Sequence, residues 1–197
     1  DALPISALQP FVGRIAQVPP KVSAVHVAGQ RAYKLARQGQ DFELASRIVE
    51  VDSIELLDVA LPEFTVEIVC SGGTYIRSIG RDVGENLGCG ALMTTLERTA
   101  VGPFRVDEAT PLDAITRDAL PGLLLPNLTA VGHLPTIPLT EQEVRAIRCG
   151  QSVPVGDCSL EPQSEAALID DAGQLVGIGV WDAATARLQP RVVLPPS

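Results

Sequence analysis

The segment from Cys70 to Ser78 constrains the fold of this chain more than any other. Before it, residues 65–70 alternate between polar and apolar side chains, which predicts a half-buried strand. After it, apolar residues and one glycine recur at spacings of three and four, as on the buried face of an amphipathic helix; they are Ile76, Ile79, Gly80, Val83 and Leu87. Two glycines and Thr74 lie between, and we expect Thr74 to cap the helix. The sequence therefore predicts a strand, a tight turn and a helix.

Tyr75 and Arg77 fall at this predicted strand-to-helix corner. An aromatic ring and a guanidinium two residues apart can stack a flat base and clamp an anion. The alternative is a tyrosine that packs over the edge of the core beside a solvated arginine. The short motif alone does not decide between these interpretations.

Three separated blocks of sequence, one of which contains this corner, resemble a known protein family when they are taken together. The first comprises Gln17-Val18-Pro19-Pro20-Lys21-Val22-Ser23-Ala24, Gly29-Gln30-Arg31-Ala32-Tyr33 and Ala36-Arg37-Gln38-Gly39; the second is Cys70–Ser78 with Asp82-Val83-Gly84 and Leu87-Gly88; the third is Leu96-Glu97-Arg98-Thr99 with Gly102-Pro103-Phe104. In order and spacing, over about residues 9–115, they resemble the TruB family of bacterial tRNA pseudouridine synthases. Those enzymes isomerise a uridine of the tRNA T-loop to pseudouridine.

The resemblance implies roles for individual residues. Arg77 would hold a nucleophilic aspartate ionised and oriented, because an opposite charge within a few ångströms lowers a carboxyl pKa. Tyr75 would lie against the flipped uracil, and Leu96 would form an apolar wall that excludes water. Arg98 is expected to contact the substrate. The reaction needs no cofactor, and no metal is expected.

The family's catalytic aspartate lies in a G-x-L-D-x-x-A-x-G motif ahead of the first block, and no aspartate of this sequence has that context. We therefore expect the chain to be the C-terminal two-thirds of the enzyme and to be inactive alone. The alternative is a non-catalytic module that binds tRNA or acts as a tRNA chaperone. The guide-dependent synthases of archaea and eukaryotes share the G-T-Y-I-R element, but the compact length after the motif and the first block favour the bacterial enzymes.

Charge is unevenly distributed along the chain. The net charge of −9 opposes contact with phosphate overall. Residues 14–47, however, contain six Lys or Arg against two Asp or Glu. A local basic patch suffices for phosphate contact, although a solvated helix face is the alternative. The resemblance implies that a thumb segment, residues 14–40, contacts the T-arm of tRNA; its expected RNA-binding residues are Lys21, Arg31, Tyr33 and Arg37.

The predicted fold class is α+β. Residues 1–125 are expected to form part of the catalytic domain, with a mixed, mainly antiparallel sheet. A linker rich in proline and glycine follows at 126–138. Residues 139–197 begin with a capping box, Thr140 to Glu143, and continue in short strands separated by turns, which is typical of a small β-barrel. This region resembles the RNA-binding PUA-like domain.

Within the catalytic part, further elements are expected from local patterns. Residues 31–38 are predicted to form a short helix ended by Gly39, and residues 48–59 a strand. A strand at 91–99 would place Leu96 and Arg98 on one face. A further helix is predicted to start at residues 110–113, with a proline in its first turn.

The cysteines and the hydrophobic segments indicate what class of protein this is and in which compartment it is expected. The four cysteines form no C-x-x-C pair, which argues against zinc and for a reducing compartment. No stretch of the sequence is long and apolar enough for a membrane-spanning helix, and no signal peptide is visible. We expect a cytoplasmic protein that is monomeric at full length.

Overall fold

The computed structural model describes residues 2–27, 29–156 and 160–195. The chain divides into two compact units, residues 1–96 and 97–197, which are considered separately. Among the described residues, no helix has the length and hydrophobicity needed to cross a membrane. Antiparallel sheets combined with helices make the fold α+β, as predicted.

A three-stranded antiparallel sheet organises the N-terminal unit. Its strands are β1 (Gly13–Gln17), β4 (Arg47–Ala60) and β5 (Glu63–Cys70), in the order β1-β4-β5. Half-buried and exposed residues alternate along β5, so the predicted period of two is confirmed. At the end of β1, Gln17 pairs with Arg47, the first residue of β4.

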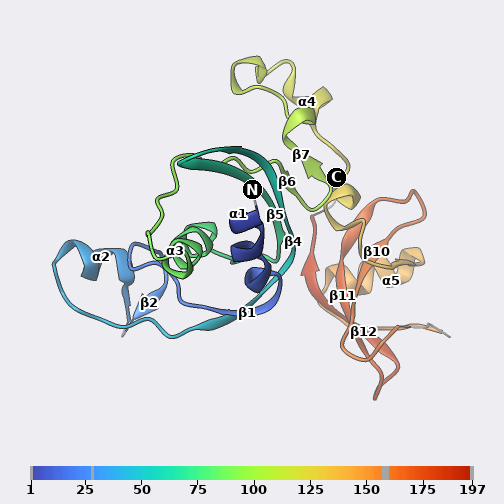
Figure 1. Ribbon diagram of the computed structural model, residues 1–197. Helices are drawn as coiled ribbons and strands as arrows, with labels where there is room; N and C mark the ends of the chain where they lie inside the picture. The colour runs from blue at the N-terminus through green and yellow to red at the C-terminus, as the bar shows by residue number, and fades with distance from the viewer. Residues whose placement is uncertain (1, 28, 157–159, 196–197) are drawn as a thin grey trace. The chain divides into compact units, whose positions relative to one another are not determined.

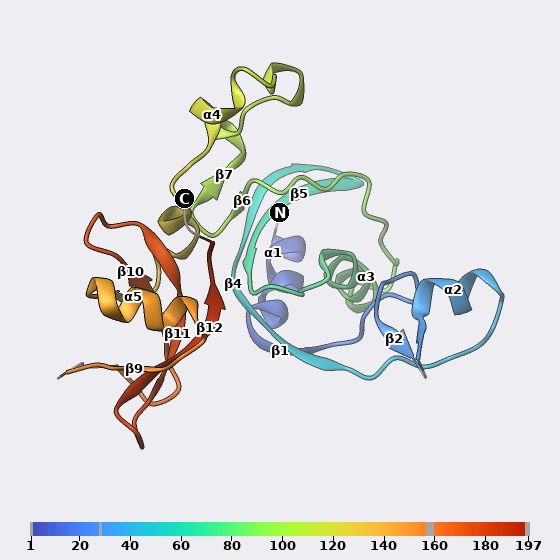
Figure 2. The same cartoon turned by 180° about the vertical axis from the view of Figure 1, so that it is seen from behind.

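Two helices cover one face of this sheet. In Figures 1 and 2, α1 (Ala2–Leu8) and α3 (Ile76–Asn86) lie inside the curve of β4 and β5. The 3-10 turn η1 (Gln9–Phe11) joins α1 to β1. The buried core comprises Leu8, Val51, Ile79 and Val83. Burying side chains of this size contributes roughly 1.5–3 kcal/mol each, so the predicted apolar stripe of α3 fixes the helix on the sheet.

The prediction that Thr74 caps α3 is wrong. The N-cap residue is Tyr75, and no side chain caps the helix. The Thr74 hydroxyl instead donates to the Ser71 carbonyl at 2.9 Å and closes the turn after β5. The Tyr75 carbonyl accepts from the Ser78 and Ile79 amides at 3.0 and 3.3 Å, which starts the helix one residue later.

A small lobe lies beside α3 in both views (Figures 1 and 2). It contains the strand pair β2 (His26–Val27) and β3 (Gln30–Arg31), followed by α2 (Ala32–Arg37). Ala32 and Leu35 are buried on one side of α2. Gly39 follows the helix with φ +68°, a conformation that glycine adopts without strain. The predicted short helix is thus confirmed.

The first part of the C-terminal unit is irregular. The hairpin β6 (Ala100–Val101) and β7 (Phe104–Arg105) is followed by short turns and one short helix: η2 (Val106–Glu108), η3 (Leu112–Ala114), α4 (Leu120–Leu123) and η4 (Asn127–Val131). The strand predicted at 91–99 is wrong, because these residues are mostly exposed and have no strand partner among the described residues. The helix predicted from residue 110 is only the single turn η3, since Ile115 is already extended.

The rest of the C-terminal unit is a five-stranded sheet with one helix. Its strands are β8 (Thr136–Pro138), β9 (Val153–Pro154), β10 (Glu165–Ile169), β11 (Leu175–Asp182) and β12 (Arg187–Val193), in the order β8-β10-β11-β12-β9. Among the strands that the structure describes, only β8 and β10 pair in parallel. The predicted capping box opens α5 (Glu141–Arg148), and β10, β11 and β12 are short strands separated by turns, as the sequence predicted.

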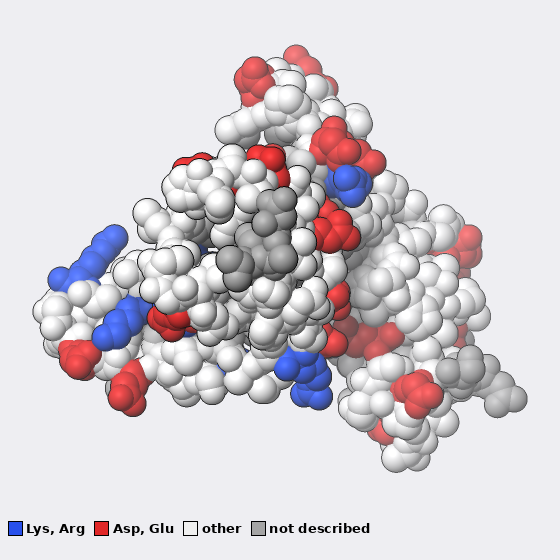
Figure 3. All heavy atoms as spheres, viewed as in Figure 1, with Lys and Arg blue, Asp and Glu red and all other residues white. Residues whose placement is uncertain are grey.

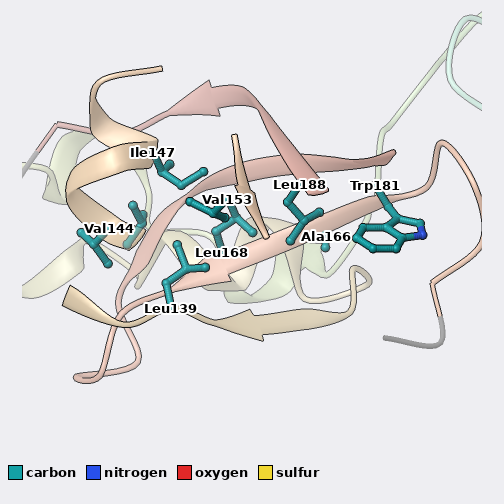
Figure 4. Close-up of a cluster of buried hydrophobic side chains, with 9 residues drawn as sticks. Leu139, Val144, Ile147, Val153, Ala166, Leu168, Trp181 and Leu188 are labelled. Carbon is teal, nitrogen blue, oxygen red and sulfur yellow. The ribbon is translucent and has the colours of Figure 1, made fainter. Parts of the chain in front are cut away.

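A separate hydrophobic core lies between α5 and this sheet. In Figure 4, Val144 and Ile147 point from α5 toward Leu168, with Trp181 at the other end of the cluster. Trp181 is 8% exposed, so it packs in the core rather than standing free at a strand end. This unit therefore has its own apolar interior.

Candidate functional site

Gln17 fixes the backbone of Tyr75 at the strand-to-helix corner. The Tyr75 amide donates to Gln17 Oε1 at 2.8 Å, and Gln17 Nε2 donates to the Tyr75 carbonyl at 3.1 Å. Gln17 is 1% exposed, so these bonds satisfy an amide side chain that has no access to water. The corner is therefore held by the end of β1 as well as by the chain on either side of it.

The next residues of α3 hold the thumb segment. Ser78 donates its hydroxyl to the Val18 carbonyl at 2.8 Å, and Arg81 donates to the same carbonyl at 3.2 Å. Arg77 Nη2 donates to the Val22 carbonyl at 3.2 Å. These contacts join two blocks that lie 55–63 residues apart in the sequence.

Arg77 combines this contact with exposure to solvent. Its only hydrogen bond among the described residues is the one from Nη2 to Val22. A guanidinium carries five N–H donors in a planar fork, so most of its donors face no protein acceptor in the described chain. Arg77 can therefore receive an anion without breaking an ion pair.

The ring of Tyr75 is half-buried and carries a cation on one face. Arg47 lies with its Cζ 4.7 Å from the ring centroid, a cation–π distance. The Arg47 guanidinium also donates to the Gly73 carbonyl. The aromatic ring at the corner is thus positioned by a residue of β4.

The predicted RNA-binding residues of the thumb segment lie on its surface, each with a contact inside the chain. Lys21 Nζ is 3.0 Å from Asp41 Oδ1, and Arg31 donates to the Ala24 carbonyl at 3.0 Å. Arg37 lies 5.6 Å over the Tyr33 ring. Figure 3 shows Lys and Arg atoms on the lobe of α2, beside a few Asp and Glu side chains.

The Lys21–Asp41 pair lies on the surface, exposed to solvent. The hydrogen bond and the charge of Lys21 hold the pKa of Asp41 below its ordinary value. Because the two side chains are 63% and 96% exposed, such a pair contributes little to stability. Lys21 can therefore exchange Asp41 for another anion at small cost.

Leu96 and Arg98 lie in the irregular segment before β6, and both are exposed. Arg98 borders a shallow hollow of ≈190 Å³ beside the hairpin; its other lining residues are Thr99, Ala100, Val101, Phe104, Arg105 and Val106. Leu96 is 59% exposed and forms no wall of that hollow. A role of Leu96 and Arg98 in the site stays a prediction.

Sequence reasoning missed Gln17 and Arg47 as parts of the corner. A signal for Gln17 was present, because the period of a strand places Gln17 on the same face as Ile15. A buried amide on that face needs a hydrogen-bond partner. Arg47 carried no such signal, since its role depends on the register that pairs it with Gln17.

Comparison with family models gives matches that together span residues 4–125. Residues 4–76 match the model described as TruB family pseudouridylate synthase (N terminal domain). Residues 77–125 match the model described as tRNA pseudouridylate synthase B C-terminal domain. The two models meet within the corner, between Ile76 and Arg77.

Curated relatives named tRNA pseudouridine synthase B resemble nearly the whole chain. The protein of Prochlorococcus marinus (strain MIT 9313) is 37% identical over 94% of this chain and 66% of its own length. That of Synechococcus sp. (strain WH7803) is 41% identical over 95% and 64%, respectively. The chain therefore spans slightly less than two-thirds of the length of these relatives.

Solved structures agree on the fold. A chain in "Structure of H/ACA RNP bound to a substrate RNA containing 2'-deoxyuridine" superposes with a TM-score of 0.73 at 22% identity, covering 100% of this chain and 62% of that one. A chain in "Crystal Structure of a Cbf5-Nop10-Gar1 Complex" gives 0.72 at 24% identity, covering 100% and 61%. From its sequence and its fold, the chain belongs to the TruB family of pseudouridylate synthases.

Proposed function

We propose that the full-length protein, meaning the product of the complete reading frame that encodes this chain, is a tRNA pseudouridine synthase. It isomerises the T-loop uridine of tRNA to pseudouridine. The supporting observation is the corner itself: Tyr75 is fixed by Gln17 and Arg47, and Arg77 beside it keeps free donors. Relatives with the name tRNA pseudouridine synthase B over nearly the whole chain support the same activity.

The residues of the corner take distinct roles in this reaction. The reaction breaks the N-glycosidic bond, rotates the uracil and joins it again through carbon; that carbon loses a proton and the freed ring nitrogen takes one up, so the product is an isomer of the uridine. The uridine leaves the T-loop stack first, because its reacting atoms are otherwise out of reach. Tyr75 lies against the flipped base. Arg77 orients the nucleophilic aspartate by a bidentate ion pair, and no motif of this sequence supplies that aspartate.

The thumb segment, residues 14–40, contacts the phosphates of the T-arm in this proposal. Lys21, Arg31 and Arg37 are exposed cations of this segment, and Tyr33 adds an aromatic surface for a base. Arg77 and Ser78 hold the base of this lobe, so contact with RNA and geometry at the corner are coupled. Leu96 and Arg98 contact the substrate in this proposal.

The domain division that we propose is a catalytic part at 1–125, a linker at 126–138 and a PUA-like RNA-binding domain at 139–197. The family models end at residue 125, and a separate core begins at Leu139, which supports the division. Three of the four arginines described in the last domain already contact Glu141, Glu165 or Ser152. Exposed Arg148 at the end of α5 is therefore the cation that remains for phosphate. The full-length protein is proposed to be monomeric and cytoplasmic.

A tRNA transcript treated with the full-length protein tests the activity. Pseudouridine is cyanoethylated selectively, so the expected result is a mass increase in the T-loop fragment after treatment with protein and reagent. A transcript whose T-loop uridine is replaced by cytidine is the matched control. Absence of the adduct on the uridine transcript would contradict the proposal, and binding of tRNA without modification would favour a tRNA chaperone instead. The codons upstream of Asp1 add a second test, since an encoded G-x-L-D-x-x-A-x-G motif would supply the aspartate.

A further inference from the structure

Arg47 occupies a central position at the corner. It begins β4, and its partner across the sheet is Gln17. Gln17 binds the Tyr75 backbone, whereas the Arg47 guanidinium covers the Tyr75 ring at 4.7 Å. Two residues paired across β1 and β4 therefore hold the backbone and the ring of the same tyrosine.

The arginine is itself restrained on several sides. It donates to the Gly73 carbonyl, and its Nε is buried without a hydrogen-bond partner among the described residues. A buried donor without a partner is unfavourable, so the stacking and the Gly73 contact must compensate for it. Gly73 has φ +86°, and a Cβ there would lie 3.7 Å from Arg47 Nη2. The turn after β5 and the guanidinium thus pack against each other.

We propose that Arg47 is a positioning residue for the target nucleotide: it fixes the Tyr75 ring from one face, so that the opposite face is presented to the uracil. This inference rests on the proposed function. Among the described residues, no second cation lies over the Tyr75 ring. A phosphate contact is the competing role, but Nη2 is engaged by Gly73 and Nε is buried. Only Nη1 then remains for a phosphate.

The kinetic test compares Arg47→Met and Arg47→Lys with Arg117→Met in the full-length protein. Arg117 is an exposed cation outside the thumb segment and the corner, so its variant controls for the loss of one charge. We expect Arg47→Met to lower the single-turnover rate at saturating tRNA by roughly tenfold or more, because small misplacements at a reacting centre are costly. Arg47→Lys restores the charge but not the planar stack, and should remain at least about fivefold slow. The tRNA Kd and its salt dependence should match those of Arg117→Met.

A spectroscopic arm reports on the ring without requiring activity. 3-Fluorotyrosine labelling gives one ¹⁹F resonance for each tyrosine of the full-length protein. The two tyrosines of this chain are assigned by the variants Tyr75→Phe and Tyr33→Phe. Arg47→Met should shift the Tyr75 resonance, whereas Tyr33, on the separate lobe, serves as the internal reference for correct folding. Should Arg47→Met fail to fold, Arg47→Lys provides the same comparison, since it keeps the length and the charge of the side chain.

The outcomes separate this inference from the proposed function. An inactive wild-type protein would refute the proposed function, and the ¹⁹F shift would still decide whether Arg47 positions Tyr75. An active protein whose Arg47 variants keep the wild-type rate would refute the inference. A weakened Kd, with a salt slope reduced by about one and an unchanged rate, would identify Arg47 as a phosphate contact and overturn it as well.

Discussion

Gln17 and Tyr75, 58 residues apart in the sequence, exchange two hydrogen bonds through the Gln17 amide and the Tyr75 backbone. The same Tyr75 carbonyl accepts from the first turn of α3. One side chain therefore fixes the residue directly before the helix, although no side chain caps the helix itself. It also ties the orientation of Tyr75 to strand β1, so the aromatic ring is positioned by the sheet.

Replacement of this amide is the first test. Gln17→Leu has nearly the same volume but leaves the Tyr75 amide without a partner, at a cost of about 1–3 kcal/mol. We expect a lower urea midpoint for the unfolding of the N-terminal unit and a single-turnover rate reduced by about tenfold. Gln40→Leu, on an exposed loop, is the matched control and should leave both unchanged. Equal stability of the two variants would mean that the two hydrogen bonds contribute nothing.

The sequence correctly predicted those strands and helices whose apolar residues recur at regular spacing. The alternation that ends at Cys70 and the stripe from Ile76 became β5 and α3, because each buries one face. The segment 91–99 shows the limit of this reasoning. The alternation in this segment places only two leucines on one face. A strand also needs a second strand to pair with, and no local sequence pattern shows whether one is present.

For the site, local chemistry predicted Tyr75 and Arg77 at the corner but not what holds them. Thr74 has the right chemistry for a cap, yet its hydroxyl reaches back to Ser71. The partners of Tyr75 come from strands whose pairing is set by register, and register depends on the whole sheet. A role for Arg98 likewise depends on tertiary contacts, which a local sequence pattern does not predict.

The capping box of α5 yields a prediction for the C-terminal unit. The Thr140 hydroxyl accepts from the Glu143 amide at 3.4 Å, while the Glu143 carboxylate accepts from the Thr140 amide at 2.8 Å. Thr140→Ala should lower the free energy of unfolding of this unit by about 1 kcal/mol. Thr110→Ala, on an exposed irregular segment of the same unit, is the control for the same change of composition. Urea unfolding followed by the fluorescence of Trp181, which is buried in the core of this unit, gives the measurement, and equal midpoints for both variants would show that the box is not stabilising.

The Lys21–Asp41 pair predicts a gain of RNA affinity on mutation. Asp41→Asn removes the anion that Lys21 contacts and frees the lysine for phosphate. We expect a Kd for a T-arm hairpin that is roughly two- to fivefold lower at low salt, with a salt slope steeper by about one. Glu43→Gln removes a nearby exposed negative charge without releasing Lys21, so it should give the smaller effect. Titration of the hairpin at several salt concentrations distinguishes the two.

The same pair fixes the sign of a pH effect. Lys21 lowers the pKa of Asp41, so the carboxylate stays ionised in the folded protein to a lower pH than in the unfolded chain. The contact is therefore intact above the ordinary range of aspartate and is lost only as the pH falls through the lowered value, below about pH 4. The ratio of the wild-type and Asp41→Asn affinities should stay constant between about pH 6 and 8. A ratio that changes across neutral pH would point to another titrating group.

Arg77 provides the prediction that bears most directly on the chemistry. Arg77→Lys keeps the positive charge but loses the planar fork, which can bind a carboxylate through two parallel hydrogen bonds. If Arg77 orients the catalytic aspartate, the single-turnover rate of the full-length protein should fall by about 10²-fold or more, while the Kd for tRNA barely changes. Lys21→Gln should show the opposite pattern, with weaker binding, a shallower salt dependence and a nearly unchanged rate at saturation. Ser78 and Arg81 hold the same segment through the Val18 carbonyl, so the fold of the lobe should survive the loss of the Arg77 bond to Val22. A variant that binds tRNA weakly but reacts at the normal rate would make Arg77 a phosphate contact and remove it from the active site.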